Sequence, residues 1–117
     1  IMNPDSEAML ITKKIVEAMD GEVREQGSHF SLVFLPTPWE IKNYSHDKHF
    51  NRRWQKMVSF ICARQINCID LMGYFQKVPL DKLDSGYDGG HYGPVSNKLI
   101  ADFIMQSIRP EEYLGSE

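Results

Sequence analysis

The chain has 117 residues, of which 42% are hydrophobic and 25% are charged, a composition ordinary for a soluble globular protein. At this length we expect one domain with a modest hydrophobic core, and the absence of an apolar run of about 18 residues predicts that nothing spans a membrane. The formal net charge is −3 and acidic and basic residues are interleaved, so the sequence lacks the basic stripe typical of nucleic-acid binding, and we expect no nucleic-acid partner.

The first predicted element is a helix over residues 4–26. Asn3 suits the N-cap, Pro4 suits the first helical position, and Gly27 is typical of the left-handed residue that ends a helix. Between these signals apolar side chains recur at helical spacing, namely Ala8, Ile11, Ile15, Met19 and Val23.

Residues 30–35 form a continuous apolar run closed by Pro36, a pattern typical of a strand buried on both faces of a parallel sheet. Residues 36–45 contain several residues that break regular structure, and they predict a loop. Ser45 then suits the N-cap of a second helix that ends near Gln65. Its apolar stripe is Phe50, Trp54, Met57, Val58 and Ile61.

Residues 66–72 are predicted to form a second buried strand. Residues 73–90 hold glycines, a proline and acidic residues without periodicity, and they predict a long loop of the kind that often carries function. Gly93-Pro94 opens a last helix that ends at Arg109-Pro110, and we expect residues 110–117 to form a mobile tail.

This alternation of strands and helices predicts an α/β fold with a parallel sheet. Two strands are fewer than an independently stable sheet needs, so the remaining strands should come from upstream or from another chain. An unpaired edge of residues 30–35 or 66–72 would then recruit a second copy into a homo-oligomer. Residues 1–20 lack a signal-peptide pattern and position 1 is not methionine, so we expect residues 1–117 to be part of a longer protein.

The candidate chemistry lies where the second long loop ends, in Asp88-Gly89-Gly90-His91. Ligands bind outside the carboxyl ends of parallel strands, and both predicted long loops lie at that edge. A turn with two glycines lets the Asp88 carboxylate fold onto one imidazole nitrogen of His91, which leaves the other nitrogen to act as a general base. In the competing interpretation Asp88 caps a turn and His91 packs beside a helix, and for these four residues alone it is the stronger one.

A longer segment resembles a known family. Residues 88–101, which follow the apolar strand 66–72, resemble the C-terminal block of SGNH (GDSL-like) hydrolases. The helix that leads into residues 31–36 resembles the penultimate helix and strand of that family, so the resemblance covers nearly the whole chain, although only the Asp-x-x-His block is specific. It implies a flavodoxin-like three-layer α/β/α sheet of which only the C-terminal part is present. It also implies an esterase or acylhydrolase in which Asp88 and His91 belong to a Ser-His-Asp triad.

The family's Gly-Asp-Ser nucleophile block and its oxyanion-hole glycine and asparagine do not occur in this sequence. The resemblance therefore implies the C-terminal half of an enzyme for O-acyl esters on a small molecule, carbohydrate or lipid, inactive as a separate piece. The alternative from another class is a non-catalytic α/β binding or assembly module of the same fold.

Other residues have both functional and structural interpretations. Trp39 and Tyr44 in the first loop, with Tyr92 beside His91, are candidates for binding the substrate, and a role in covering the core is equally consistent with their type. His46 and His49 have no third ligand at a suitable spacing, so we expect no metal site and no cofactor.

The acidic residues Asp81, Asp84 and Asp88 lack a calcium-loop pattern and are predicted to be solvated. Cys62 and Cys68 are predicted to be buried free thiols, and they leave the compartment open between a bacterial cell envelope and the cytoplasm.

Overall fold

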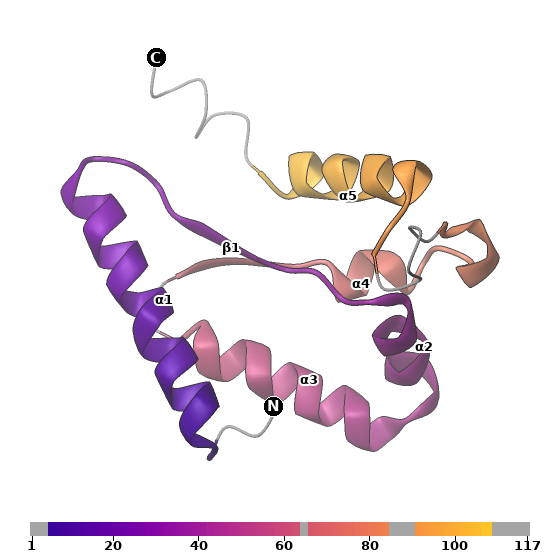
Figure 1. The fold of residues 1–117 in the computed structure, drawn as a ribbon, viewed down its shortest axis with the longest axis horizontal. Helices are drawn as coiled ribbons and strands as arrows, with labels where there is room; N and C mark the ends of the chain where they lie inside the picture. Colours follow the sequence, from indigo (N-terminus) through magenta and orange to yellow (C-terminus); the bar gives the residue numbers. More distant parts are fainter. Residues whose placement is uncertain (1–4, 64–65, 85–90, 109–117) are drawn as a thin grey trace.

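The computed structural model describes residues 5–63, 66–84 and 91–108. This part of the chain is mostly helical around a small parallel sheet, in agreement with the predicted α/β class (Figure 1). In chain order the elements are α1 (Glu7–Glu25), β1 (Ser31–Phe34), α2 (Pro38–His46), α3 (Lys48–Ile61), β2 (Asn67–Asp70), α4 (Met72–Phe75), the 3₁₀ turn η1 (Leu80–Lys82) and α5 (Pro94–Ser107).

The sheet is the pair β1 and β2, which run parallel and in register from Ser31 opposite Asn67 to Phe34 opposite Asp70. Figure 1 places α3 on one side of the strand pair and α5 on the other. The apolar side chains around the sheet form two clusters, and the larger one includes residues of both α3 and α5. One is formed by Met9, Val16, Ile61 and Ile66 with Leu32 and Cys68 packed on it, and the other by residues that include Ile69, Leu71, Met72 and Phe75 with Val33, Ile100, Phe103 and Ile104 packed on it.

Helix α1 begins later than the sequence predicts. Ser6 is its N-cap, and the Ser6 side chain accepts a hydrogen bond of 3.1 Å from the Met9 N–H. The predicted cap Asn3 lies outside the described residues. The predicted stop is confirmed, because Gly27 has a φ of 77° and its N–H donates to the Arg24 carbonyl in a left-handed cap.

The loop predicted over residues 36–45 was wrong, since most of it is α2. Thr37 and Glu40 form a reciprocal capping box, in which the Glu40 N–H donates to the Thr37 hydroxyl and the Thr37 N–H donates to the Glu40 carboxylate. This box stabilises the first helical turn although Pro38 is in it, because proline at the first position gives up no hydrogen bond. Ser45 consequently lies inside α2, and Asp47 takes the predicted capping role for α3.

The second strand and the loop after it also differ from the prediction. Strand β2 stops at Asp70, because the chain turns at Leu71 into the short helix α4. The segment predicted as an unbroken loop over residues 73–90 therefore contains most of α4 and the turn η1. Residues 85–90 of that segment lie outside the described residues.

The prediction of free thiols was wrong, because Cys62 and Cys68 form a disulfide. Cys62 is the C-cap of α3 and Cys68 is in β2, so the bridge ties the helix to the strand that follows it. The sequence predicts free thiols because two cysteines are too few for a disulfide framework, whereas a single bridge needs only that the two α-carbons come close, and here they are 6.2 Å apart.

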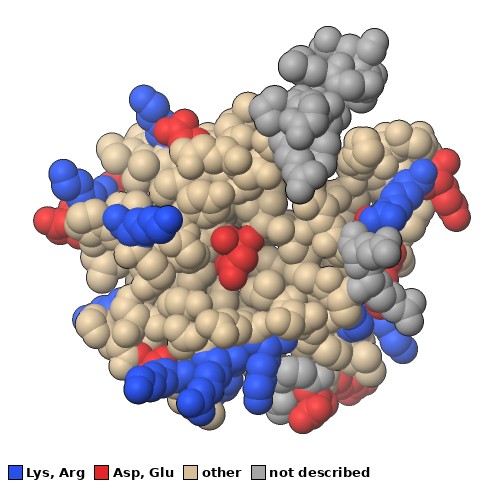
Figure 2. Space-filling model, turned by 180° about the vertical axis from the view of Figure 1, so that it is seen from behind, with Lys and Arg blue, Asp and Glu red and all other residues tan. Residues whose placement is uncertain are grey.

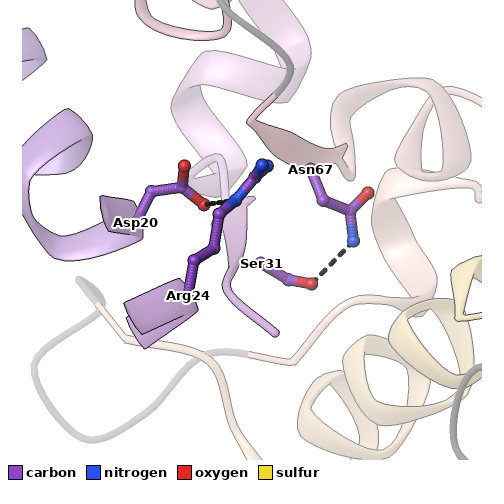
Figure 3. A network of polar contacts seen from close by, with 4 residues as sticks. All are labelled: Asp20, Arg24, Ser31 and Asn67. Atoms are coloured by element: carbon purple, nitrogen blue, oxygen red, sulfur yellow. Dashed lines mark hydrogen bonds and ion pairs between the residues drawn. The ribbon is translucent and has the colours of Figure 1, made fainter. Parts of the chain in front are cut away.

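Two polar contacts lie close to one another near the amino ends of the strands (Figure 3). The Arg24 Nε donates to the Asp20 carboxylate at 3.1 Å, and the Asn67 side-chain amide donates to the Ser31 hydroxyl at 2.7 Å. Asp20 is buried, and its charge is balanced by Arg24 one helical turn later. The first contact lies within α1, and the second joins the first residues of β1 and β2.

Candidate functional site

The candidate site is a pocket of about 360 Å³ just beyond the carboxyl end of β1. Its lining residues come from two segments that are far apart in the sequence: Leu35, Pro36 and Thr37 after β1, and His91, Tyr92 and Asn97 around the start of α5. His91 is exposed at this pocket, and Pro36 is buried beneath it. The position at the carboxyl edge of a parallel sheet is the one that the sequence predicts.

Tyr92 fixes the chain directly after His91. Its hydroxyl donates a hydrogen bond of 2.6 Å to the Pro36 carbonyl, and its ring stacks on Phe75 with centroids 5.6 Å apart and planes 6° apart. Burial raises the pKa of Tyr92 to about 12, and the nearby Glu40 carboxylate adds to the rise. Tyr92 is therefore a protonated donor at neutral pH that joins the start of α5 to the end of β1.

The aromatic side chains under Tyr92 form a continuous stack that supports α5. Phe103 of α5 meets Phe75 edge to face at 5.3 Å and stacks on Tyr74 at 5.0 Å. Phe75 is fully buried between Tyr92 and Phe103. The pocket consequently rests on packed rings, which give the residues around it fixed positions.

A second anchor joins the two sides of the segment that carries His91. The Asp84 carboxylate accepts hydrogen bonds from the Ser96 N–H at 2.7 Å and the Val95 N–H at 3.0 Å, so it caps α5 from a distance in sequence. The Ser96 hydroxyl accepts from the Asp84 N–H at 3.0 Å and donates to the Asp84 carbonyl at 3.1 Å. The Gly93 N–H also donates to that carbonyl at 3.1 Å. We call these contacts the Asp84–Ser96 clasp.

The clasp changes the interpretation of Asp84. The sequence predicts a solvated carboxylate, whereas Asp84 bonds a serine whose side chain is fully buried. Interaction with the Ser96 side chain lowers the pKa of Asp84 from 3.8, the N–H groups of Ser96 and Val95 lower it further, and partial desolvation opposes them. The charged carboxylate is thus the form that the folded protein favours.

The structure brings together only some of the residues that the sequence singles out. Tyr92 and His91 line the same pocket. Trp39 is 66% exposed on α2 and meets Phe50 edge to face at 5.8 Å, and it is not among the lining residues. The Tyr44 hydroxyl accepts a hydrogen bond from the Gln55 side chain, which directs it toward α3. Asp88, the predicted orienter, lies outside the described residues.

Sequence reasoning missed two polar residues that line the pocket and the pair that supports it. Thr37 and Asn97 line the pocket, while Asp84 and Ser96 hold its second segment. The Thr-Pro-Trp-Glu motif at residues 37–40 carried a readable signal, since serine or threonine followed by glutamate three positions later is a capping box. Asp84 carried no such signal, because it caps a helix that begins ten positions away.

No group of three or more histidine, cysteine, aspartate or glutamate side chains that could hold a metal ion occurs among the residues that the structure describes. Across the same described ranges, no helix is both long enough and apolar enough to cross a bilayer. Comparison with known proteins adds no assignment, since no family model, curated protein or solved structure matches the chain.

Proposed function

We propose that this chain is the C-terminal part of an SGNH-type hydrolase that cleaves O-acyl esters, with His91 as the general base. The observation that carries the proposal is the position of His91 at the pocket beyond β1, where a parallel sheet offers its ligand site. Histidine suits proton transfer near neutral pH, and an exposed imidazole at a pocket can reach a substrate hydroxyl or a nucleophile.

Asp88 is proposed as the carboxylate that orients the His91 ring, on the strength of the Asp-x-x-His spacing. In a Ser-His-Asp triad this carboxylate fixes the tautomer of the histidine and stabilises the imidazolium that forms during the reaction. The serine nucleophile and the oxyanion-hole donors would come from residues outside this chain.

The flavodoxin-like three-layer sheet is part of the same proposal. Support comes from the parallel strand pair, with α3 on one side and α5 on the other, which matches one end of such a sheet. The pocket has an apolar floor of Leu35 and Pro36 and polar groups on Thr37, His91 and Asn97, which suits an acyl group on a hydroxyl-bearing carrier such as a carbohydrate or lipid. The Cys62–Cys68 disulfide favours an oxidising compartment, such as a bacterial cell envelope, over the cytoplasm.

The test is ester hydrolysis by the complete natural protein, assayed with p-nitrophenyl acetate and with an acetylated oligosaccharide. His91→Ala should remove nearly all turnover, and Asp88→Asn should lower kcat by a large factor, on the order of 10⁴ as in serine-protease triads. His49→Ala is the matched control, because His49 is an exposed histidine at the start of α3, away from the pocket lining, and its loss should leave the rate unchanged.

Two outcomes would refute the proposal. If the unaltered protein hydrolyses neither ester, the non-catalytic module is the better description. If it hydrolyses them and His91→Ala retains full activity, then the chemistry belongs to other residues.

A further inference from the structure

The interleaved charges of the sequence predict no basic stripe, but the outer face of α3 concentrates positive charge. Four basic side chains lie on this helix and all four are exposed, while the helix contains no aspartate or glutamate: Lys48, Arg52, Arg53 and Lys56. Figure 2 shows Lys and Arg side chains gathered along the lower edge of the molecule, over α3. The opposite, apolar face of the helix is buried through Phe50, Trp54 and Ile61. The exposed face thus keeps one orientation relative to the rest of the protein.

The charge on α3 is opposite to that of the remaining chain. Its four basic residues give +4, whereas the other nine basic and sixteen acidic residues give −7. None of the four side chains forms an ion pair with any residue in the described ranges, in contrast to Lys13 and Arg24 of α1. A uniform cationic helix on an acidic protein is available for an anionic partner.

The surface along this face is also hollowed. An open hollow of about 470 Å³ is lined by Arg52, Gln55, Lys56, Ser59 and Phe60. It combines two cations with an amide and a hydroxyl that can bond sugar hydroxyls, and with an aromatic ring that can pack on a sugar ring. The ammonium of Lys13 from α1 lies 5.0 Å from the centre of the Phe60 ring and holds that ring in place at one end of the hollow.

We propose that the outer face of α3 binds a linear acidic polysaccharide. Lys48, Arg52 and Lys56 follow one another at four-residue intervals, so their positions along the helix axis are about 6 Å apart. A polymer with one carboxylate on each sugar presents a repeated negative charge that complements this row of cations, and its hydroxyl groups suit Gln55 and Ser59. This proposal does not depend on the hydrolase activity, because it involves none of the residues that line the His91 pocket.

The same features disfavour two other anionic partners. A helix that binds a bilayer inserts its apolar face among the lipids, whereas the apolar face of α3 is buried in the protein. Double-stranded DNA carries one negative charge about every 1.7 Å along its axis, far more than four cations neutralise, and the rest of this protein has a negative net charge that repels it.

Titration of the full chain with polygalacturonate oligomers at low salt tests the proposal by calorimetry. We expect binding that weakens as salt is raised, and little binding of the same oligomers after full methyl esterification, which removes their charge. Arg52→Gln combined with Lys56→Gln should weaken binding about tenfold, the loss expected from two exposed ion contacts. The exchange Arg52→Lys with Lys56→Arg should retain binding, which separates charge from packing.

The matched control is Lys77→Gln with Lys82→Gln, which removes the same charge from two exposed lysines outside α3 and should leave the affinity unchanged. Circular dichroism and the unfolding temperature confirm that each variant folds. The proposal is overturned if the chain does not bind polygalacturonate at low salt, if the control pair weakens binding equally, or if the esterified oligomers bind equally well. Tighter binding of single-stranded DNA or of anionic vesicles than of polygalacturonate would also overturn it.

Discussion

The Asp84–Ser96 clasp makes Ser96→Ala a sharp test of how the segment that carries His91 is held. The Ser96 side chain is fully buried, and its hydroxyl makes one hydrogen bond with the Asp84 N–H and another with the Asp84 carbonyl. Alanine fits the same space, because only one oxygen is removed. The substitution therefore probes the hydrogen bonds with little change in packing.

The expected cost is about 2 kcal/mol of unfolding free energy, since two hydrogen bonds contribute about 1 kcal/mol each and the partly buried Asp84 N–H is left without its partner. For a domain of this size 1 kcal/mol lowers Tm by roughly 4 °C, so Ser96→Ala should lower Tm by roughly 8 °C. Thermal unfolding followed by circular dichroism measures this change. Hydrogen exchange measured by NMR should also show faster exchange of the Asp84 and Ser96 amides.

Ser59→Ala is the matched control. Ser59 is exposed on α3, and surface substitutions of this kind change stability by about 0.5 kcal/mol or less. If Ser96→Ala lowers Tm no more than Ser59→Ala does, and the Asp84 amide exchanges at its original rate, then the clasp does not hold this segment.

Three further predictions concern the other anchors. Tyr92 has a folded pKa of about 12 against an ordinary 10.0, so its contribution to stability is complete below pH 10 and declines as the pH rises toward 12. Absorbance titration should show one tyrosine that ionises at a higher pH than the others, and this late transition should be missing from Tyr92→Phe. Asp84 has a folded pKa below 3.8, so its contribution to stability is present above pH 3.8 and is lost as the pH falls through the folded pKa. Asp84→Asn should make the fall of stability with decreasing pH less steep, and an unchanged pH dependence would contradict the role of Asp84 in the clasp. The Cys62–Cys68 disulfide joins two residues six positions apart in the sequence, and its reduction should lower the free energy of unfolding by about 2 kcal/mol. A thiol reagent should not label the protein before reduction, and labelling at that stage would contradict the bridge.

The parts of the fold that the sequence predicted are those set by local apolar patterns. The two apolar runs became β1 and β2, and the amphipathic stripe with Phe50 and Trp54 became the buried face of α3. Gly27 and Pro94 marked helix boundaries because each restricts the backbone in a specific way. Patterns of this kind need no knowledge of the rest of the structure.

The parts that it missed depend on pairing between side chains. Thr37 and Glu40 stabilise α2 within a segment whose composition is typical of a loop. Cys62 and Cys68 meet only because helix α3 reverses into β2. Asp84 and Ser96 are joined across a segment whose intervening residues give no sign of it. Composition counts residues one at a time, and therefore it cannot detect these reciprocal contacts.

The candidate site shows the same division between local and distant information. The sequence identified His91 and the sheet edge, whereas the two anchors that fix the position of His91 came only from the structure. Tyr92, the next residue, is tied to the Pro36 carbonyl, and Gly93, the residue after it, is tied to the Asp84 carbonyl. Both ties reach segments outside α5, so they position the backbone directly after His91 relative to the end of β1 and to Asp84. If a reaction takes place at this pocket, loss of either anchor should impair it even when Asp88 is unchanged, because the backbone next to His91 would no longer keep its position.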